Sequence, residues 1–213
     1  MKLVIFGASG GTGQHLVQQA LAQGHAVTAF ARRPESILAA PSPGLTVVQG
    51  DVHDAAAVSA VIAGQDAVLS GLGARNLGKS DVLEVGVRNI LAGMAAHGVR
   101  RIIVLGASGA AAGADQHLDA GTRMFLKLIS TTILKEPFRS QREQERQLEA
   151  SAMDYTIVRP PRLLNGPFTG HYRVQDDGLP PDGLTINRAD VADFMLRQLT
   201  DAAWIRKGPY LAK

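Results

Sequence analysis

A glycine-rich turn between an apolar run and an amphipathic segment is the feature that most restricts the fold of this chain. Residues 2–6 (KLVIF) are a short apolar run, and residues 7–13 (GASGGTG) follow at once. Apolar side chains then recur at positions 16, 17, 20 and 21, which is the spacing of one helix face. A strand, a glycine turn and a helix in this order are typical of the first βα unit of a dinucleotide-binding sheet.

The glycines of this turn have separate expected uses. Gly7 allows a sharp exit from the strand, Gly10 leaves room for a pyrophosphate at the backbone, and Gly13 lets the helix pack closely on the sheet. Phosphates would then lie over free N–H groups at the positive end of the helix. The other candidate ligands in the turn are Ser9, Gly11 and Thr12. A turn without a ligand is the alternative, and we disfavour it because glycines cost backbone entropy.

A basic residue follows the second expected strand, residues 26–31. Arg32 and Arg33 stand about 20 residues after the glycine turn, where an acid often binds the ribose hydroxyls of NAD. An arginine there can instead form a bidentate pair with a 2′-phosphate. Arg32 therefore predicts NADP(H) rather than NAD(H). The alternative is a pair of solvated arginines before Pro34, and for Arg33 the two interpretations stay open.

The rest of the chain repeats the strand and helix alternation. Further strands are expected at 45–49, 66–70, 101–105 and 154–158, and helices at 54–64, 82–97, 122–134, 136–151 and 190–199. This order predicts one doubly wound parallel α/β domain over residues 1–213, a Rossmann fold with helices on both faces. Residues 163–186 are rich in turns and predict a small substrate-side excursion. Residues 109–121 predict a mobile loop beside the site, and 208–211 an edge strand.

Candidate site residues gather where strands end, which is the edge at which ligands bind in such sheets. Asp51 follows the third strand and could accept a hydrogen bond from an adenine amino group or form a turn. Asp54 and Asn187 are expected to cap helices. The further candidates at strand ends are Val52, Leu72, Gly73, Arg75, Ser108, Pro161 and Arg162.

Composition excludes several other classes of protein. The chain has 213 residues and no cysteine, so disulfides, thiolate metal sites and cysteine nucleophiles are absent, and the six histidines lack metal-ligand spacing. A net charge of +3 without a basic, aromatic stripe gives no support for nucleic acid binding. Neither a signal-like start nor an apolar run of bilayer length is present. We expect a cytoplasmic monomer that acts on a small molecule, with no metal and no membrane partner.

Several motifs together resemble one known family. They are the turn at 7–13, Arg32, G-D-V at 50–52, G-A-R-N at 73–76, V-R-N-I at 87–90, A-H-G-V at 96–99, R-P-P-R at 159–162, P-F-T-G at 167–170 and A-D-F-M-L-R at 192–197. Over nearly its whole length the chain resembles the atypical, NmrA-like NAD(P)-binding short-chain dehydrogenases. Within them it is most similar to the biliverdin-IXβ reductase/flavin reductase family.

The resemblance implies an NADPH-dependent reductase of flavins, and in some members of quinones or linear tetrapyrroles. By position, the turn and Arg32 would bind the cofactor, and Asp51 with Val52 would flank the adenine. Leu72, Gly73 and Arg75 would lie along the cofactor, whereas Ser108, Pro161 and Arg162 would lie on the nicotinamide side. Arg162 stands where a family member has a histidine, and Gln141 stands near another, which weighs against tetrapyrrole reduction more than against cofactor binding.

The pair of residues that serves classical short-chain dehydrogenases is absent. Those enzymes use a tyrosine followed four positions later by a lysine, whereas Tyr155 is followed by Arg159 and Tyr172 by Asp176. Chemistry between an alcohol and a ketone needs an acid at the oxygen and is therefore unsupported. Flavins, quinones and conjugated tetrapyrroles delocalise the added charge, so positioning of the reactants suffices.

Two side chains are candidates for a direct part in such chemistry. Ser108 could orient the nicotinamide amide or the acceptor, and Arg162 could attract an anionic acceptor; a small residue at a strand exit and a surface arginine are the alternatives. A non-catalytic NADP(H)-sensing regulator is the rival function, since it too needs no acid. A third possibility is a nucleotide-sugar or isoprenoid-type reductase with a displaced catalytic acid, which would act on a carbonyl and little on free flavin.

Overall fold

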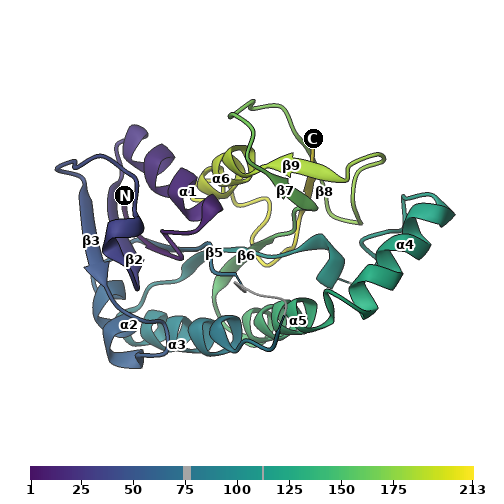
Figure 1. Ribbon diagram of the computed structural model, residues 1–213. Helices are drawn as coiled ribbons and strands as arrows, with labels where there is room; N and C mark the ends of the chain where they lie inside the picture. The colour runs from purple at the N-terminus through teal and green to yellow at the C-terminus, as the bar shows by residue number, and fades with distance from the viewer. Residues whose placement is uncertain (74–77, 112) are drawn as a thin grey trace.

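A six-stranded parallel sheet forms the centre of the molecule (Figure 1). The computed structural model describes residues 1–73, 78–111 and 113–213. Along the sheet the strands are β3 (Leu45–Gln49), β2 (Ala26–Ala31), β1 (Lys2–Phe6), β4 (Ala67–Ser70), β5 (Arg101–Leu105) and β6 (Asp154–Val158). The chain order reverses between β1 and β4, so the crevice outside their carboxyl ends is the expected ligand site. The predicted doubly wound sheet is confirmed.

Helices cover both faces of this sheet, as predicted (Figure 1). The helices are α1 (Gly11–Ala22), α2 (Ala55–Ile62), α3 (Val82–His97), α4 (Ala120–Thr131), α5 (Lys135–Ala150) and α6 (Arg188–Arg197). On one face lie α1 and α6, and on the other α2, α3 and α5, whereas α4 extends away from the sheet. No helix within the described residues has the length and apolar character needed to cross a membrane.

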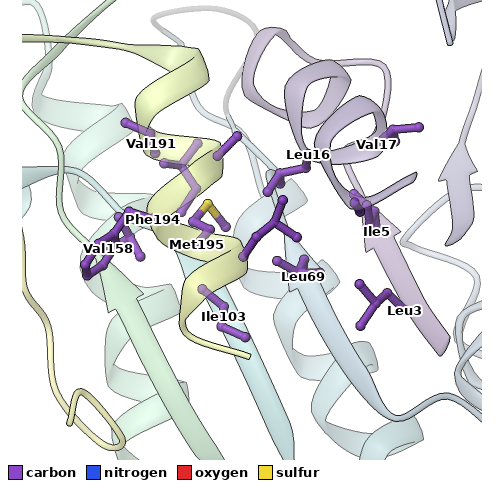
Figure 2. Close-up of a cluster of buried hydrophobic side chains, with 14 of the residues drawn as sticks. Leu3, Ile5, Leu16, Val17, Leu69, Ile103, Val158, Val191, Phe194 and Met195 are labelled. Atoms are coloured by element: carbon purple, nitrogen blue, oxygen red, sulfur yellow. The ribbon is translucent and has the colours of Figure 1, made fainter. Parts of the chain in front are cut away.

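Each face of the sheet has its own apolar core. Figure 2 shows the core under α1 and α6, whose labelled side chains are Leu3, Ile5, Leu16, Val17, Leu69, Ile103, Val158, Val191, Phe194 and Met195. On the other face the rings of Phe6 and Phe30 meet edge to face at 5.2 Å between centroids. Burial of both faces explains why the strands are continuous apolar runs without polar alternation.

Several element boundaries differ from the sequence expectation. The first helix begins inside the glycine turn, at Gly11, and the last begins at Arg188. Asn187 does occupy the N-cap of α6, but its Nδ2 donates to the Pro167 carbonyl at 2.9 Å and does not cap the helix. Asp54 caps α2 as expected, since its carboxylate accepts from two amides of the first turn.

The expected excursion contains short strands of its own. They are β7 (Arg162–Leu164), which pairs with β9 (Thr185–Asn187), and β8 (Arg173–Gln175), which pairs with β10 (Tyr210–Ala212). The edge strand expected at 208–211 is therefore β10, and its ladder is formed with β8. It reaches the main sheet through an isolated bridge between Arg159 and Tyr210 beyond the end of β6.

Described residues of the segment expected to be a mobile loop, 109–121, pack against the excursion. The segment starts in a 3-10 turn, η2 (Ser108–Ala110), and a second such turn, η1 (Pro34–Ser36), follows β2. Ala114 and Leu118 are buried with Leu179, whose N–H donates to the Ala114 carbonyl at 2.9 Å. A lid motion of this segment stays a prediction.

Candidate active site

A cleft of about 350 Å³ lies at the carboxyl ends of β1 to β4. The candidates that line it are Gly7, Ser9, Gly10, Gly11, Thr12, Arg32, Asp51, Val52, Leu72 and Gly73. Its other walls come from Phe30, Ala31, Gly50, Gly71, Val82, Leu105, Leu163 and Arg188. Residues placed far apart in the sequence thus meet at the switch point between β1 and β4. Arg75 lies outside the described residues.

The start of α1 suits a phosphate. Its N-cap, Gly10, supplies no side-chain cap, and the first turn contains no acid. In α2, by contrast, Asp54 already satisfies the first-turn amides. The amides at the start of α1 therefore lack an internal side-chain acceptor, and the helix dipole favours an anion there. This uncapped, glycine-lined helix end fits a dinucleotide diphosphate.

Two glycines of the turn are required by close backbone contacts. Gly7 has a φ of +72°, and a β-carbon there would come within 2.7 Å of the Gly71 carbonyl carbon. A β-carbon at Gly13 would overlap the carbonyl oxygen of Gly7. Gly13 thus packs behind the turn, which is why it does not line the cleft. The turn can hold its shape only with glycine at both positions.

Charged side chains form a chain of contacts at the end of the cleft formed by β2 and β3. Arg32 Nη1 lies 3.8 Å from Asp51 Oδ2, and Asp51 Oδ1 accepts from the His53 amide at 3.0 Å. The His53 ring joins Asp51 at 2.6 Å to Asp81 at 3.0 Å. Hydrogen bonds from His53 lower the pKa of Asp51, and the bond to Asp51, followed by that to Asp81, raises the pKa of His53.

This network changes the interpretation of two residues. Asp51 is a turn residue whose carboxylate is also hydrogen-bonded to the His53 ring and forms an ion pair with Arg32. His53 was not among the candidate site residues. His53 lies two residues after Asp51, and at this spacing an aspartate side chain often accepts a hydrogen bond from the backbone N–H. This spacing was the signal in the sequence that could have indicated the contact.

A second, larger cavity of about 1340 Å³ adjoins the ends of β5 and β6. Its walls are mainly apolar and come from η2, α4, the start of α5 and the excursion, including Ala107, Ala111, Leu134, Phe138, Pro160, Leu179 and Leu184. Lys127 and Arg162 bring two cations to it, and Asp115 one acid. Leu105 and Leu163 line the cleft, whereas Ala107 and Arg162 line the cavity, so neighbouring residues of the chain contribute to both spaces at these strand ends.

The remaining candidates lie in this second cavity. Ser108 is buried, and its N–H donates to the Pro160 carbonyl at 2.9 Å. Pro161 follows in the same wall, and the Arg162 N–H donates to the Leu184 carbonyl at 3.2 Å. The structure therefore brings Ser108, Pro161 and Arg162 together in the wall of one cavity.

The tyrosines are held in other interactions. The Tyr172 hydroxyl donates to Asp193 at 2.6 Å, and burial, with that bond, raises the pKa of Tyr172. The Arg206 guanidinium lies 5.3 Å from the centre of the Tyr155 ring, and Arg159 lies 5.4 Å from that of Tyr210. Within the described lining of the cleft and the cavity there is no tyrosine. Nor do the described residues contain a cluster that could hold a metal ion.

The cleft also contains a residue that sequence reasoning did not single out. Arg188, the first residue of α6, lines it although it lies far from the glycine turn in the sequence. Its place directly after Asn187, which was expected to cap a helix, was the signal available, but nothing in that pattern shows which element α6 approaches.

Comparison with known proteins agrees with this geometry. The model of the NAD(P)H-binding family matches residues 7–202. The chain belongs to this family. The predicted NAD(P)-binding family and its cofactor class are thereby confirmed.

Curated relatives resemble the chain to different extents. An uncharacterised chloroplastic protein of Arabidopsis thaliana is 29% identical over 209 residues, covering 93% of this chain and 71% of its own length. An uncharacterised protein of Mycobacterium tuberculosis is 36% identical over 105 residues. That match spans 48% of this chain and only 12% of the mycobacterial protein, so it relates one segment of a much longer molecule.

Solved structures share the fold over the whole chain. A putative exported protein of Burkholderia pseudomallei is 26% identical with a TM-score of 0.80, and each chain is covered completely. ChuY, an anaerobillin reductase of Escherichia coli O157:H7, is 24% identical with a TM-score of 0.81 and covers 100% of this chain and 97% of its own. A Veillonella parvula short-chain dehydrogenase/reductase in complex with NADP is 18% identical, with a TM-score of 0.78 and coverages of 100% and 94%.

Proposed function

We propose that this protein is an NADPH-dependent reductase of a flavin, a quinone or a related conjugated acceptor. One observation carries the proposal: the cleft that fits a dinucleotide and a large apolar cavity are lined by neighbouring residues of the chain at the ends of β5 and β6, and the described lining of the cavity has no tyrosine. An apolar cavity of about 1340 Å³ accommodates a polycyclic acceptor. An acceptor that delocalises charge needs no phenolic acid beside it.

The residues of the chain then have separate tasks. When bound, NADPH supplies a hydride. The glycine turn and the start of α1 bind the diphosphate, Asp51 and Val52 flank the adenine, and Ser108 with Pro161 forms the wall beside the nicotinamide. The apolar walls exclude water and keep the acceptor close, so proximity and orientation contribute most of the catalysis.

Two cations favour an acceptor with an anionic edge. Arg162 and Lys127 line the cavity, whereas Asp115 is the acid among its lining residues. A flavin phosphate or a carboxylate side chain would therefore find an attractive field at the cavity wall. Arg32 at the far end of the cleft favours NADPH over NADH. The proposal also holds that the protein acts as a monomer in the reducing, cytoplasmic compartment.

Turnover of NADPH with defined acceptors tests the function. Purified protein is mixed with NADPH and FMN, riboflavin, a simple quinone or biliverdin, and the loss of nicotinamide absorbance is followed. Saturable turnover with at least one acceptor is expected. Tight NADPH binding without turnover of any acceptor would refute the reductase and favour the NADP(H)-sensing regulator, which needs no acceptor cavity.

A charge variant tests the acceptor side more closely. Arg162→Gln should raise KM for FMN about two- to fivefold, as expected for one exposed charge pair, and leave KM for riboflavin unchanged because riboflavin lacks the phosphate. Arg123→Gln removes the same charge from an exposed position of α4 outside the cavity lining, so it serves as the matched control. Equal effects of both variants on FMN would show that Arg162 acts only through net charge.

A further inference from the structure

Arg188 crosses the start of the phosphate-binding helix. Its Cδ and Nε atoms lie 2.8 Å from the place that a β-carbon on Gly11 would take. Gly11 is the first residue of α1, and both residues line the cofactor cleft. The Arg188 side chain therefore passes directly over Gly11, in the space that a β-carbon there would take. The guanidinium that begins α6 is thus brought to the amino end of α1, where the diphosphate of the cofactor would lie.

Neutral partners hold this guanidinium. Arg188 Nη1 donates to Asn165 Oδ1 at 2.6 Å and lies 3.4 Å from the Leu163 carbonyl oxygen. Within the described part of the chain, no carboxylate forms an ion pair with it. A guanidinium has five N–H donors, and both described bonds start from Nη1. Its charge and its other donors therefore remain available for an anion.

A different buried arginine shows the contrast. Arg159 Nη2 lies 2.8 Å from Glu145 Oε2, and both side chains are largely buried. The carboxylate neutralises that guanidinium inside the protein. Arg188 is only partly buried and is oriented by an amide, which fixes its position without cancelling its charge. A guanidinium that is oriented but not neutralised is typical of an arginine that binds a phosphate.

We propose that Arg188 donates hydrogen bonds to the cofactor diphosphate and that Asn165 is its positioning residue. The proposal rests on the cofactor part of the proposed function. It assigns two phosphate contacts to two arginines: Arg32 to the 2′-phosphate, which NADPH alone carries, and Arg188 to the diphosphate, which NADH and NADPH share. Asn165 follows β7, whose first residue, Arg162, lines the acceptor cavity, so the same bond ties the cofactor cleft to the acceptor wall.

Equilibrium binding separates these assignments without any acceptor. NADPH, NADH and adenosine 2′-monophosphate are titrated by calorimetry into the wild type and Arg188→Gln. The variant should lose about ten- to a hundredfold in affinity for NADPH and for NADH alike, the range of a hydrogen bond to a charged group. Affinity for adenosine 2′-monophosphate, which has no diphosphate, should stay unchanged.

Three further variants guard against an effect on folding or on net charge. Arg188→Lys retains a cation and should recover part of the affinity for both dinucleotides. Asn165→Ala retains the guanidinium of Arg188 but removes the hydrogen bond that orients it. We expect a smaller loss of affinity, equal for NADPH and NADH. Arg100→Gln removes one charge near the start of β5, at the opposite edge of the sheet, and should change none of the three affinities.

Two results would overturn the proposal. Unchanged affinity of Arg188→Gln for both dinucleotides would show that the guanidinium does not reach the diphosphate. An equal loss for adenosine 2′-monophosphate would show that the variant disturbs the whole cleft. Because the readout is cofactor binding, a protein that binds NADPH through Arg188 but reduces no acceptor would refute the reductase proposal and leave this one standing.

Discussion

Replacing Arg32 with alanine should abolish the proposed preference for NADPH over NADH. Arg32 stands at the exit of β2 on the wall of the cofactor cleft, and its side chain is 44% exposed. The partner closest to it among the ion pairs is Asp51, 3.8 Å away and 42% exposed. Such an exposed pair is worth about 0–1 kcal/mol, so Arg32 can be diverted to a phosphate at little cost.

The size of the effect follows from these contacts. A charge-assisted hydrogen bond to a phosphate contributes about 1.5–3 kcal/mol, which corresponds to about ten- to a hundredfold in affinity for NADPH. NADH has no 2′-phosphate and should bind the variant almost as well as the wild type. The loss for NADPH should lie toward the upper end of the range, because Asp51 is left facing the phosphate without the guanidinium between them.

Calorimetric titration of both dinucleotides measures this selectivity. The double variant Arg32→Ala/Asp51→Asn tests the contribution of the remaining carboxylate, and it should recover part of the NADPH affinity. A loss shared equally by NADPH and NADH would refute the assignment of Arg32 to the 2′-phosphate. It would instead place this arginine against a part of the cofactor that both dinucleotides have in common.

Three other substitutions test the turn, the buried ion pair and the histidine network. Gly13→Ala should lower the urea midpoint and abolish NADPH binding, since its β-carbon would overlap a backbone oxygen of the turn; a stable variant with normal affinity would contradict this. Glu145→Gln should reduce the free energy of unfolding by about 3–5 kcal/mol, because it strands the buried Arg159 charge; a loss below about 1 kcal/mol would show that the pair is not needed. Asp51 raises the pKa of His53 above 6.5, so this bond stabilises the fold below that value and its contribution is lost as pH rises through the raised pKa. The difference in melting temperature between the wild type and His53→Gln should therefore decrease as the pH rises from about 6 to about 9. A difference that stays constant over this range would argue against the network.

The regular elements of the sheet could be predicted because their signals are local. The strands at 2–6, 26–31 and 101–105 are apolar runs flanked by turn residues, and the structure has these bounds. Helix boundaries were less accurate. The turn at 7–13 serves two elements at once, so its last residues belong to α1 although their glycines suggested a loop.

The excursion shows why long-range pairing escapes sequence patterns. Its strands β7, β8 and β9 are three residues each, too short for a periodic signal. They pair with partners that only the folded chain brings close, such as β10 with β8. Likewise the segment 109–121 looked open because it is rich in alanine and glycine, yet Ala114 and Leu118 are buried against Leu179.

The sequence by itself determined the order of the main-sheet strands and of the helices, and it placed the candidate residues at the strand ends. The carboxyl ends of parallel strands lie at one edge of the sheet, so the candidates that follow these strands necessarily lie close together there. Only the tertiary structure decided which charged groups face one another across that edge. The link from Arg32 through Asp51 to His53 and Asp81, and the passage of Arg188 over Gly11, join residues up to 177 positions apart. Contacts of this kind depend on how whole elements pack, because no local pattern of residue types encodes the distance between two helix ends.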